Sequence, residues 1–217
     1  MIVLGIDGAL GSFSAAIARD DATAAVELEG SVALEGGLDA IARAMRDEGV
    51  TSTDLDRVAV GIGPGGFTGL RIAVAYAKSL ALAWRLPLVG VLSFDAVEFG
   101  HDLPRSLAIV SGRAGVISAR YREGDRTRRA SGLIAGVLDE VLPAELEGPL
   151  PVAGTLAQDV LDALGERGID VERPSSHARP PAAAIARIGA ARAPAASPHE
   201  VRADYGERPA AKIPKLR

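Results

Sequence analysis

One stretch, residues 61–83 with the sequence GIGPGGFTGLRIAVAYAKSLALA, restricts the possible folds of this chain more than any other. An apolar run over residues 57–62 precedes it, and Gly63-Pro64-Gly65-Gly66 then interrupts regular structure. Apolar side chains recur with helical spacing over residues 67–83. A strand, a tight glycine loop and a helix in this order place free N–H groups at the end of a sheet, where anions bind well. The loop is therefore either a binding loop or a packing corner that cannot admit side chains.

The composition limits the chemistry and the compartment. The chain has 217 residues, of which 48% are hydrophobic and only 4% aromatic, so its core must consist of Ala, Val, Leu and Ile. A net charge of -4 gives no general attraction to nucleic acid or to an anionic membrane. The absence of cysteine excludes disulfides and thiolate sites and fits a reducing compartment. The N-terminal residues lack the pattern of a signal peptide, and no long apolar window occurs. We therefore expect a cytoplasmic protein with no membrane partner.

The first half of the chain predicts the element order β-β-β-α-β-α. Three short strands open it as an antiparallel meander. Glu35-Gly36-Gly37 breaks the pattern, and a helix from Leu38 to Gly49 follows. The remaining elements are the strand and the helix on either side of the glycine loop, then a short strand at 89–92.

The second half repeats this order after a boundary at residues 100–105. The expected elements are strands at 107–110, 116–121 and 127–130, a helix at 133–142, a strand at 150–153, and helices at 155–164 and 181–192. We therefore expect an α/β protein with two lobes, residues 1–104 and a smaller lobe at 105–217. Four prolines after Ala193 predict an irregular tail that lies on the body or moves.

Asp7 and Gly8 form the first candidate site, because they follow the first strand and precede a glycine turn. The carboxylate and the turn amides could hold a metal-bound phosphate. The simpler interpretation is a hairpin that needs Asp and Gly for its geometry, and we favour it.

The glycine loop is the stronger candidate, but it matches neither a Walker loop nor a dinucleotide fingerprint. Thr68 is placed to cap the helix that follows. Arg71 lies in the first turn, where it opposes the helix dipole, so we expect it to have an acidic or carbonyl partner elsewhere.

No catalytic residue and no metal site emerge from the rest of the chain. The three histidines, at positions 101, 177 and 199, do not stand at metal-ligand spacing, and no serine occupies a nucleophile elbow. One basic cluster contains five arginines, Arg120, Arg122, Arg126, Arg128 and Arg129. It either contacts RNA phosphates or forms a solvated hairpin balanced by Glu123 and Asp125; we favour the hairpin.

The loop resembles the signature of the bacterial TsaB (YeaZ) family, Gly-Pro-Gly-Ser-Phe-Thr-Gly-Leu/Val-Arg-Ile-Gly. Gly66 stands in place of the serine and Ala73 in place of the last glycine. The opening residues resemble that family's Ile-Leu-Ala-Ile-Asp-Thr-Ser-Thr start, with Asp7 at the shared aspartate. The resemblance covers about the first hundred residues. Later, Ser111-Gly112-Arg113 replaces the family's Asp-Ala-Arg turn, and only Tyr205, Arg208 and Ala211 echo its ending.

The resemblance implies two ribonuclease-H-like lobes of the actin/hexokinase/Hsp70 (ASKHA, Gcp-like) architecture. It also implies a non-catalytic subunit that supports the TsaD transferase in forming N6-threonylcarbamoyladenosine at position 37 of tRNA (t6A). The TsaD metal-binding histidines are absent from this chain. The implied partners are a TsaD-like subunit in a heterodimer and a TsaE-like ATPase, with tRNA contacted indirectly and a homodimer in the absence of TsaD. We expect no intrinsic cofactor, and ATP or ADP binding only in the complex.

Two sets of residues follow as candidate sites. The signature residues are Gly63, Pro64, Gly65, Gly66, Phe67, Thr68, Gly69 and Arg71. The candidate partner-interface residues, taken from two apolar helix faces, are Leu38, Ile41, Met45, Leu70, Val74, Ala77, Lys78 and Ala81. Two alternatives stay open: an ATPase or phosphotransferase of the same fold, and a glycoprotease-like hydrolase, for which we find neither a metal site nor a nucleophile–base pair.

Overall fold

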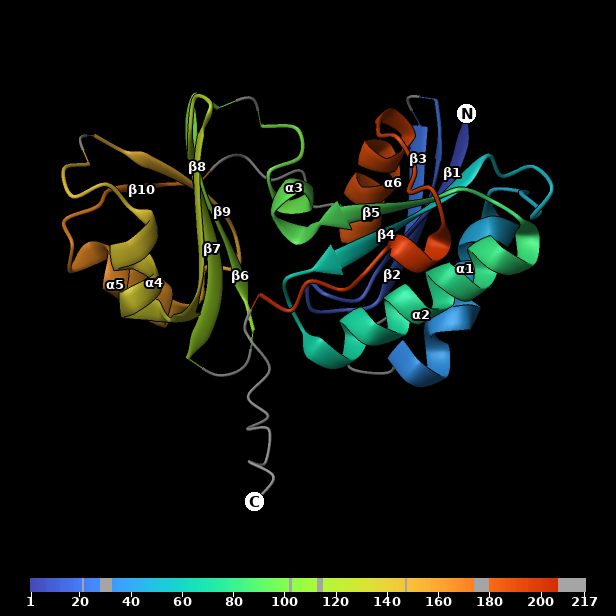
Figure 1. Cartoon of the computed structure of the whole chain (residues 1–217), viewed down its shortest axis with the longest axis horizontal. Coiled ribbons are helices and arrows are strands. Elements are labelled where there is room, and N and C mark those ends of the chain that lie inside the picture. Colours follow the sequence, from blue (N-terminus) through green and yellow to red (C-terminus); the bar gives the residue numbers. More distant parts are fainter. Residues whose placement is uncertain are drawn as a thin grey trace, which may run out of the picture.

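Two five-stranded mixed sheets form the framework of the protein (Figure 1). The computed structural model describes residues 1–20, 22–27, 33–101, 103–112, 115–146, 148–173 and 180–206. The first sheet contains β1 (Ile2–Asp7), β2 (Ser14–Arg19), β3 (Ala22–Glu27), β4 (Arg57–Gly63) and β5 (Leu88–Leu92). The second contains β6 (Arg105–Ser111), β7 (Val116–Glu123), β8 (Arg126–Leu133), β9 (Leu150–Gly154) and β10 (Val171–Glu172).

The two sheets have the same topology. Their strand orders are β3-β2-β1-β4-β5 and β10-β9-β6-β7-β8. In each, the first three strands in sequence pair antiparallel, and the last two run parallel to the first strand. This repeat confirms the predicted α/β fold with two ribonuclease-H-like lobes.

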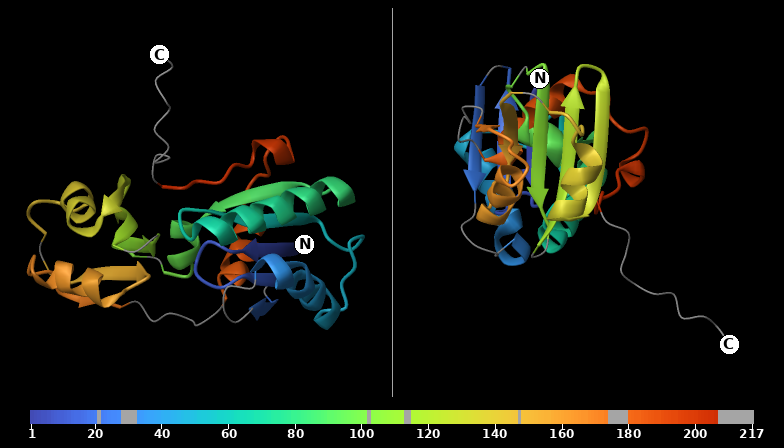
Figure 2. Two further views of the ribbon diagram at one scale, coloured as in Figure 1. Left: turned by 90° about the horizontal axis from the view of Figure 1, so that it is seen from below. Right: turned by 90° about the vertical axis from the view of Figure 1, so that its left-hand side faces the viewer.

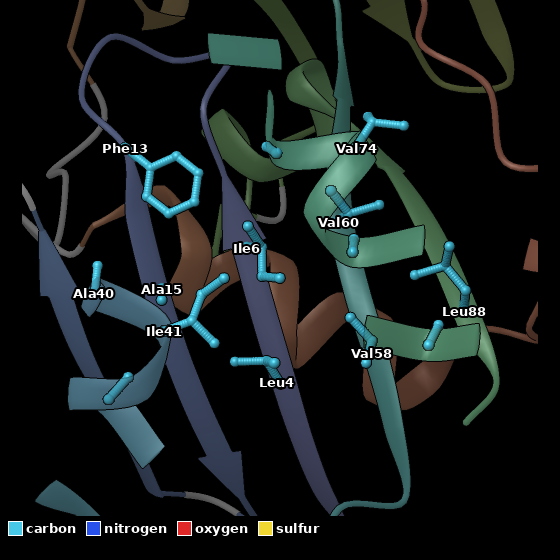
Figure 3. Packing of buried hydrophobic residues seen from close by; sticks show 14 of the residues in the cluster. Leu4, Ile6, Phe13, Ala15, Ala40, Ile41, Val58, Val60, Val74 and Leu88 are labelled. Atoms are coloured by element: carbon cyan, nitrogen blue, oxygen red, sulfur yellow. The ribbon is translucent and has the colours of Figure 1, made fainter. Parts of the chain in front are cut away.

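One face of the first sheet packs against α1 (Ala33–Asp47) and α2 (Phe67–Trp84). Figure 3 shows Leu4, Ile6, Val58 and Val60 pointing from β1 and β4 into this layer. Phe13, fully buried, meets Tyr76 of α2 edge to face with ring centroids 6.1 Å apart. Aliphatic side chains therefore build most of this core, as the composition predicts.

The other face of the first sheet packs against α6 (Pro181–Ala191). A side chain at Gly5 would overlap the backbone of Ala182, and one at Gly189 would overlap Ala59, so α6 lies directly on the strands. The assignment of this helix to the second lobe is therefore wrong (Figure 1). Because both faces of the sheet are covered, β1 is buried over almost its whole length.

The first helix begins earlier than the sequence predicts. It includes Glu35, Gly36 and Gly37, which we expected to interrupt regular structure. A side chain at Gly37 would collide with the rings of Tyr76 and Phe13. The glycine is thus needed for close packing inside a helix, and tertiary contacts outweigh its poor helix propensity.

The second lobe has its own core between its sheet and the helices α4 (Ile134–Val141) and α5 (Gln158–Gly165). The helix predicted from Thr155 begins three residues later, because the Thr155 N–H donates to the Ile109 carbonyl at 2.8 Å and extends the strand connection. The short helix α3 (Ser93–Val97) lies between the lobes, where Phe94 packs against Ala108 and Val110 of β6.

The end of the described chain, residues 192–206, returns along the first lobe. It includes one 3-10 turn, η1 (Pro198–Glu200), and the Ala195 N–H donates to the Leu88 carbonyl of the edge strand β5 at 3.0 Å. In Figure 2 this segment follows α2 toward the second lobe. The expected irregular tail therefore lies on the body as far as residue 206. Arg208 and Ala211 lie outside the described residues, as do Arg113 and His177.

Candidate functional site

The glycine loop joins the end of β4 to α2 and lies against the turn that follows β1. Gly63 and Gly65 have φ of 92° and 155°, which favour glycine. The Gly66 N–H donates to the Ala9 carbonyl at 2.7 Å. The loop and the β1–β2 turn are therefore joined through their backbones, and one loop amide already has a protein partner.

Gly8 and Gly69 form a second point of close backbone contact between these two segments. A Cβ atom on Gly8 would overlap the carbonyl of Gly69, and a Cβ on Gly69 would overlap the carbonyl of Gly8. A Cβ on Gly65 would likewise overlap the Ala9 carbonyl. The two turns that would surround a phosphate thus touch each other, which favours the packing-corner interpretation.

Asp7 is fully buried beneath the turn. Its Oδ2 accepts the N–H groups of Ala9 at 3.2 Å and Leu10 at 3.0 Å, and its Oδ1 has no partner among the described residues. Burial removes the carboxylate from water and raises its pKa to about 6. The hydrogen bonds fit the favoured reading, a carboxylate that shapes the turn, and the described residues contain no group of three or more potential metal ligands.

Thr68 and Arg71 differ from their predicted roles. The N-cap of α2 is Gly66 and makes no side-chain cap, while Thr68 is exposed on the first turn. The Arg71 Nε donates to the Tyr205 hydroxyl at 3.1 Å, and its guanidinium lies 3.9 Å from the centre of the Phe67 ring. Among the described residues, Arg71 therefore pairs with the Tyr205 hydroxyl and with the rings of Phe67 and Tyr205, not with the expected acid or carbonyl. Nothing in the local sequence indicates Tyr205, 134 residues away, as its partner.

Most of the predicted partner-interface residues are buried inside the first lobe. Ile41, Leu70, Val74, Ala77 and Ala81 are less than a tenth exposed, because the apolar stripe of each helix faces the sheet. Met45 is partly buried against the same core, and the Lys78 ammonium lies 3.5 Å from the His199 carbonyl. Leu38 alone of the set is exposed, at 50%. The prediction that the buried residues contact a partner is therefore wrong for this conformation.

The exposed side of α2 has a different set of residues. Ala75, Ser79 and Ala83 are exposed at helical spacing, and Leu82 is 47% exposed. The sequence does indicate this exposed face, because its positions recur at helical spacing between those of the apolar stripe. The face is nevertheless hard to recognise from sequence, because small residues can line either side of a helix.

Two members of the arginine cluster join the lobes. Arg120, largely buried, forms ion pairs with Asp95 and Glu98 around α3, and its guanidinium lies 5.2 Å from the Phe94 ring. Arg129 pairs with Asp204 and also lies 5.2 Å from Phe94. The interpretation of a hairpin balanced by Glu123 and Asp125 is therefore wrong for these two arginines, whose partners come from other segments.

No helix in the described part of the chain is long and apolar enough to cross a membrane.

Comparison with known proteins identifies the family. The family model described as "TsaD: tRNA N6-adenosine threonylcarbamoyltransferase" matches residues 35–176, more than half of the chain. An uncharacterized protein of Mycobacterium tuberculosis is 37% identical over 154 residues, which cover 70% of this chain and 66% of that protein. The tRNA threonylcarbamoyladenosine biosynthesis protein TsaB of Escherichia coli is 37% identical over 82 residues, or 36% of each chain.

The solved structures agree on the fold. YeaZ from Pseudomonas aeruginosa superimposes with a TM-score of 0.68 and 19% identity, covering 94% of this chain and 99% of that one. A second P. aeruginosa structure with similarity to YeaZ gives a TM-score of 0.70 at 18% identity, covering 95% and 99%. The chain belongs to the family that the TsaD model describes, and it is a TsaB (YeaZ)-like protein.

Proposed function

We propose that this protein acts in t6A formation as a non-catalytic subunit that binds and supports a TsaD-like transferase. The similarity to E. coli TsaB and to the TsaD family model supports a place in this pathway. The non-catalytic role is proposed because the histidines are not at metal-ligand spacing and the glycine loop packs against the β1–β2 turn.

The observation that carries the proposal is the exposed side of α2. Ala75, Ser79 and Ala83 present little side-chain bulk, so another helix can approach closely along this side. Leu82 on α2 and Leu38 on the neighbouring α1 are each about half exposed and offer further apolar contacts. A helical surface of a TsaD-like partner fits this face, and a second copy of the chain occupies it when that partner is absent.

The ATPase alternative gains no support from this geometry. A cavity of about 290 Å³ near the boundary between the lobes is lined, among the described residues, by His101 and Arg173 and by no carboxylate that would hold Mg²⁺. The other described residues that line it are apolar or glycine. The hydrolase alternative lacks a nucleophile–base pair among the described side-chain hydrogen bonds. Binding of ATP or ADP in the complex, a TsaE-like ATPase as a further partner, and indirect contact with tRNA belong to the same proposal.

Co-purification with a TsaD-like subunit and a reconstituted tRNA-modification assay test this function. Leu82→Glu should weaken binding about tenfold or more, since it places a charge in the proposed contact. Leu133→Glu is the matched control, because Leu133 is 72% exposed but lies on the second lobe at the start of α4. Equal binding by both variants would reject the α2 face. Absence of binding and of any gain in modification by the unaltered chain would reject the function itself.

A further inference from the structure

The segment 201–206 is anchored on the first lobe at two points. Val201 is 6% exposed and packs into the first-lobe core beside Gly90. Three residues later, the Asp204 N–H donates to the Ile62 carbonyl at the end of β4, at 2.6 Å. A Cβ atom on Gly63 would overlap the Asp204 carbonyl, so the segment lies directly on the glycine loop.

The same segment contacts the second lobe. The Asp204 carboxylate pairs with Arg129 of β8 and also accepts the Gly206 N–H at 2.9 Å. Gly206 lies against Ser118 and Ser131, whose hydroxyl groups are 2.7 Å apart on β7 and β8. Residues 201–206 therefore bridge the glycine loop of one lobe and the sheet of the other.

The ion pairs of Arg120 and Arg129, which both link the lobes, differ in burial. Arg120 and Glu98 are 13% and 7% exposed in their ion pair at α3, whereas Arg129 and Asp204 are 33% and 30% exposed. An exposed ion pair contributes little free energy, whereas breaking a buried one leaves an uncompensated buried charge. The Asp204–Arg129 ion pair is thus the more hydrated of the two, and breaking it costs less free energy.

We propose that residues 201–206 form a releasable strap that keeps the lobes closed over the end of the glycine loop, and that the Asp204–Arg129 ion pair holds this strap in place. When the ion pair breaks, the second sheet rotates away from the first lobe about the α3 connection, while Val201 keeps the strap attached to the first lobe. This device acts within a single chain and does not depend on the proposed partner.

Distances between spin labels on the isolated chain test the strap. The sequence contains no cysteine, so Arg46→Cys on α1 and Glu140→Cys on α4, both exposed, give one label on each lobe without background. With the strap closed, we expect one narrow distance distribution. Asp204→Asn and Arg129→Gln should each broaden this distance distribution. Each should also speed hydrogen exchange of the backbone N–H of residue 204 about fivefold.

Two further variants separate the strap from general destabilisation. Arg202→Ala removes a charge from the same segment, but Arg202 is exposed and has no ion pair among the described residues, so the distribution should stay narrow. The charge-swapped double variant Arg129→Asp with Asp204→Arg should restore the narrow distribution. The proposal is overturned if the single variants match the Arg202→Ala control, or if the swap leaves the distribution broad.

Discussion

Glycine is required at position 69 because of a contact, not because of its backbone angles. Gly69 lies in the first turn of α2, and a methyl group there would overlap the Gly8 carbonyl. Gly69→Ala should therefore lower the free energy of unfolding by about 1–3 kcal/mol, as overpacking does elsewhere. Urea denaturation followed by circular dichroism measures this change.

Gly66 supplies the matched control for this prediction. A Cβ atom there would come no closer than 3.6 Å to the Ala9 carbonyl, and its φ of -58° suits any residue. Gly66→Ser, the residue usual in the related signature, should keep or slightly raise stability because serine is a good N-cap. Equal losses in both variants would contradict the role assigned to the Gly8–Gly69 contact.

The buried carboxyl of Asp7 makes stability depend on pH. Its pKa is about 6 in the folded chain and 3.8 in the unfolded one, because burial disfavours the charged form. Between these values the folded state holds more protons, so the contribution of Asp7 is present below about pH 4 and is lost as the pH rises through about 6. Asp7→Asn removes this dependence.

Melting temperatures of the wild type and Asp7→Asn from pH 4 to 7.5 check the prediction. The variant should gain relative to the wild type as the pH rises, by on the order of 2 kcal/mol across the range. Asp162→Asn, at an exposed position on α5, controls for the loss of a negative charge. Parallel pH profiles for wild type and Asp7→Asn would contradict a raised pKa.

At the scale of elements, α3 holds the lobes together through Arg120. Its guanidinium meets Asp95 and Glu98, and Ser106 of β6 donates to the other oxygen of Glu98 at 2.6 Å. Arg120→Ala would leave the largely buried Glu98 carboxylate without its cation and Asp95 with Arg192 as its remaining cation, so we expect a loss of about 3 kcal/mol. Arg126→Ala on the same hairpin, exposed and without an ion pair among the described residues, should change stability by less than about 0.5 kcal/mol. Comparable losses in denaturant titrations of the two variants would show that the α3 network is not a connection of this strength.

Local sequence predicts the elements well where periodicity and turn chemistry agree, as in the strand, loop and helix around Gly63. It fails at Gly37, because the close packing of Tyr76 and Phe13 requires glycine inside the helix there. This packing cannot be predicted from the neighbouring sequence. The candidate site, too, can be predicted only in part. The loop glycines are evident from sequence, but the Arg71–Tyr205 and Arg129–Asp204 pairs join residues 134 and 75 positions apart.

For the whole molecule, the repeated element order predicts two lobes of one topology, and the two sheets confirm it. It does not predict which lobe receives the alanine-rich helix α6. Small apolar residues occur on most sides of that helix, so its sequence fits either sheet. The close approach of Gly5 and Gly189 to their partners, together with the hydrogen bond from the Ala182 N–H to the Ser14 hydroxyl, fixes it on the first sheet.

The position of α6 on the first sheet predicts which part of the chain folds alone. Residues 1–104 lack α6, so they leave the face around Val3, Ala59 and Val91 exposed to water and should not fold cooperatively. Residues 1–101 joined to 180–206 by a flexible Gly/Ser linker regain that cover and should show a single unfolding transition. Near-UV circular dichroism and urea titration of both fragments compare them. A cooperative transition for residues 1–104 alone, at the same midpoint, would show that α6 is dispensable and that the first lobe ends where the sequence places its boundary.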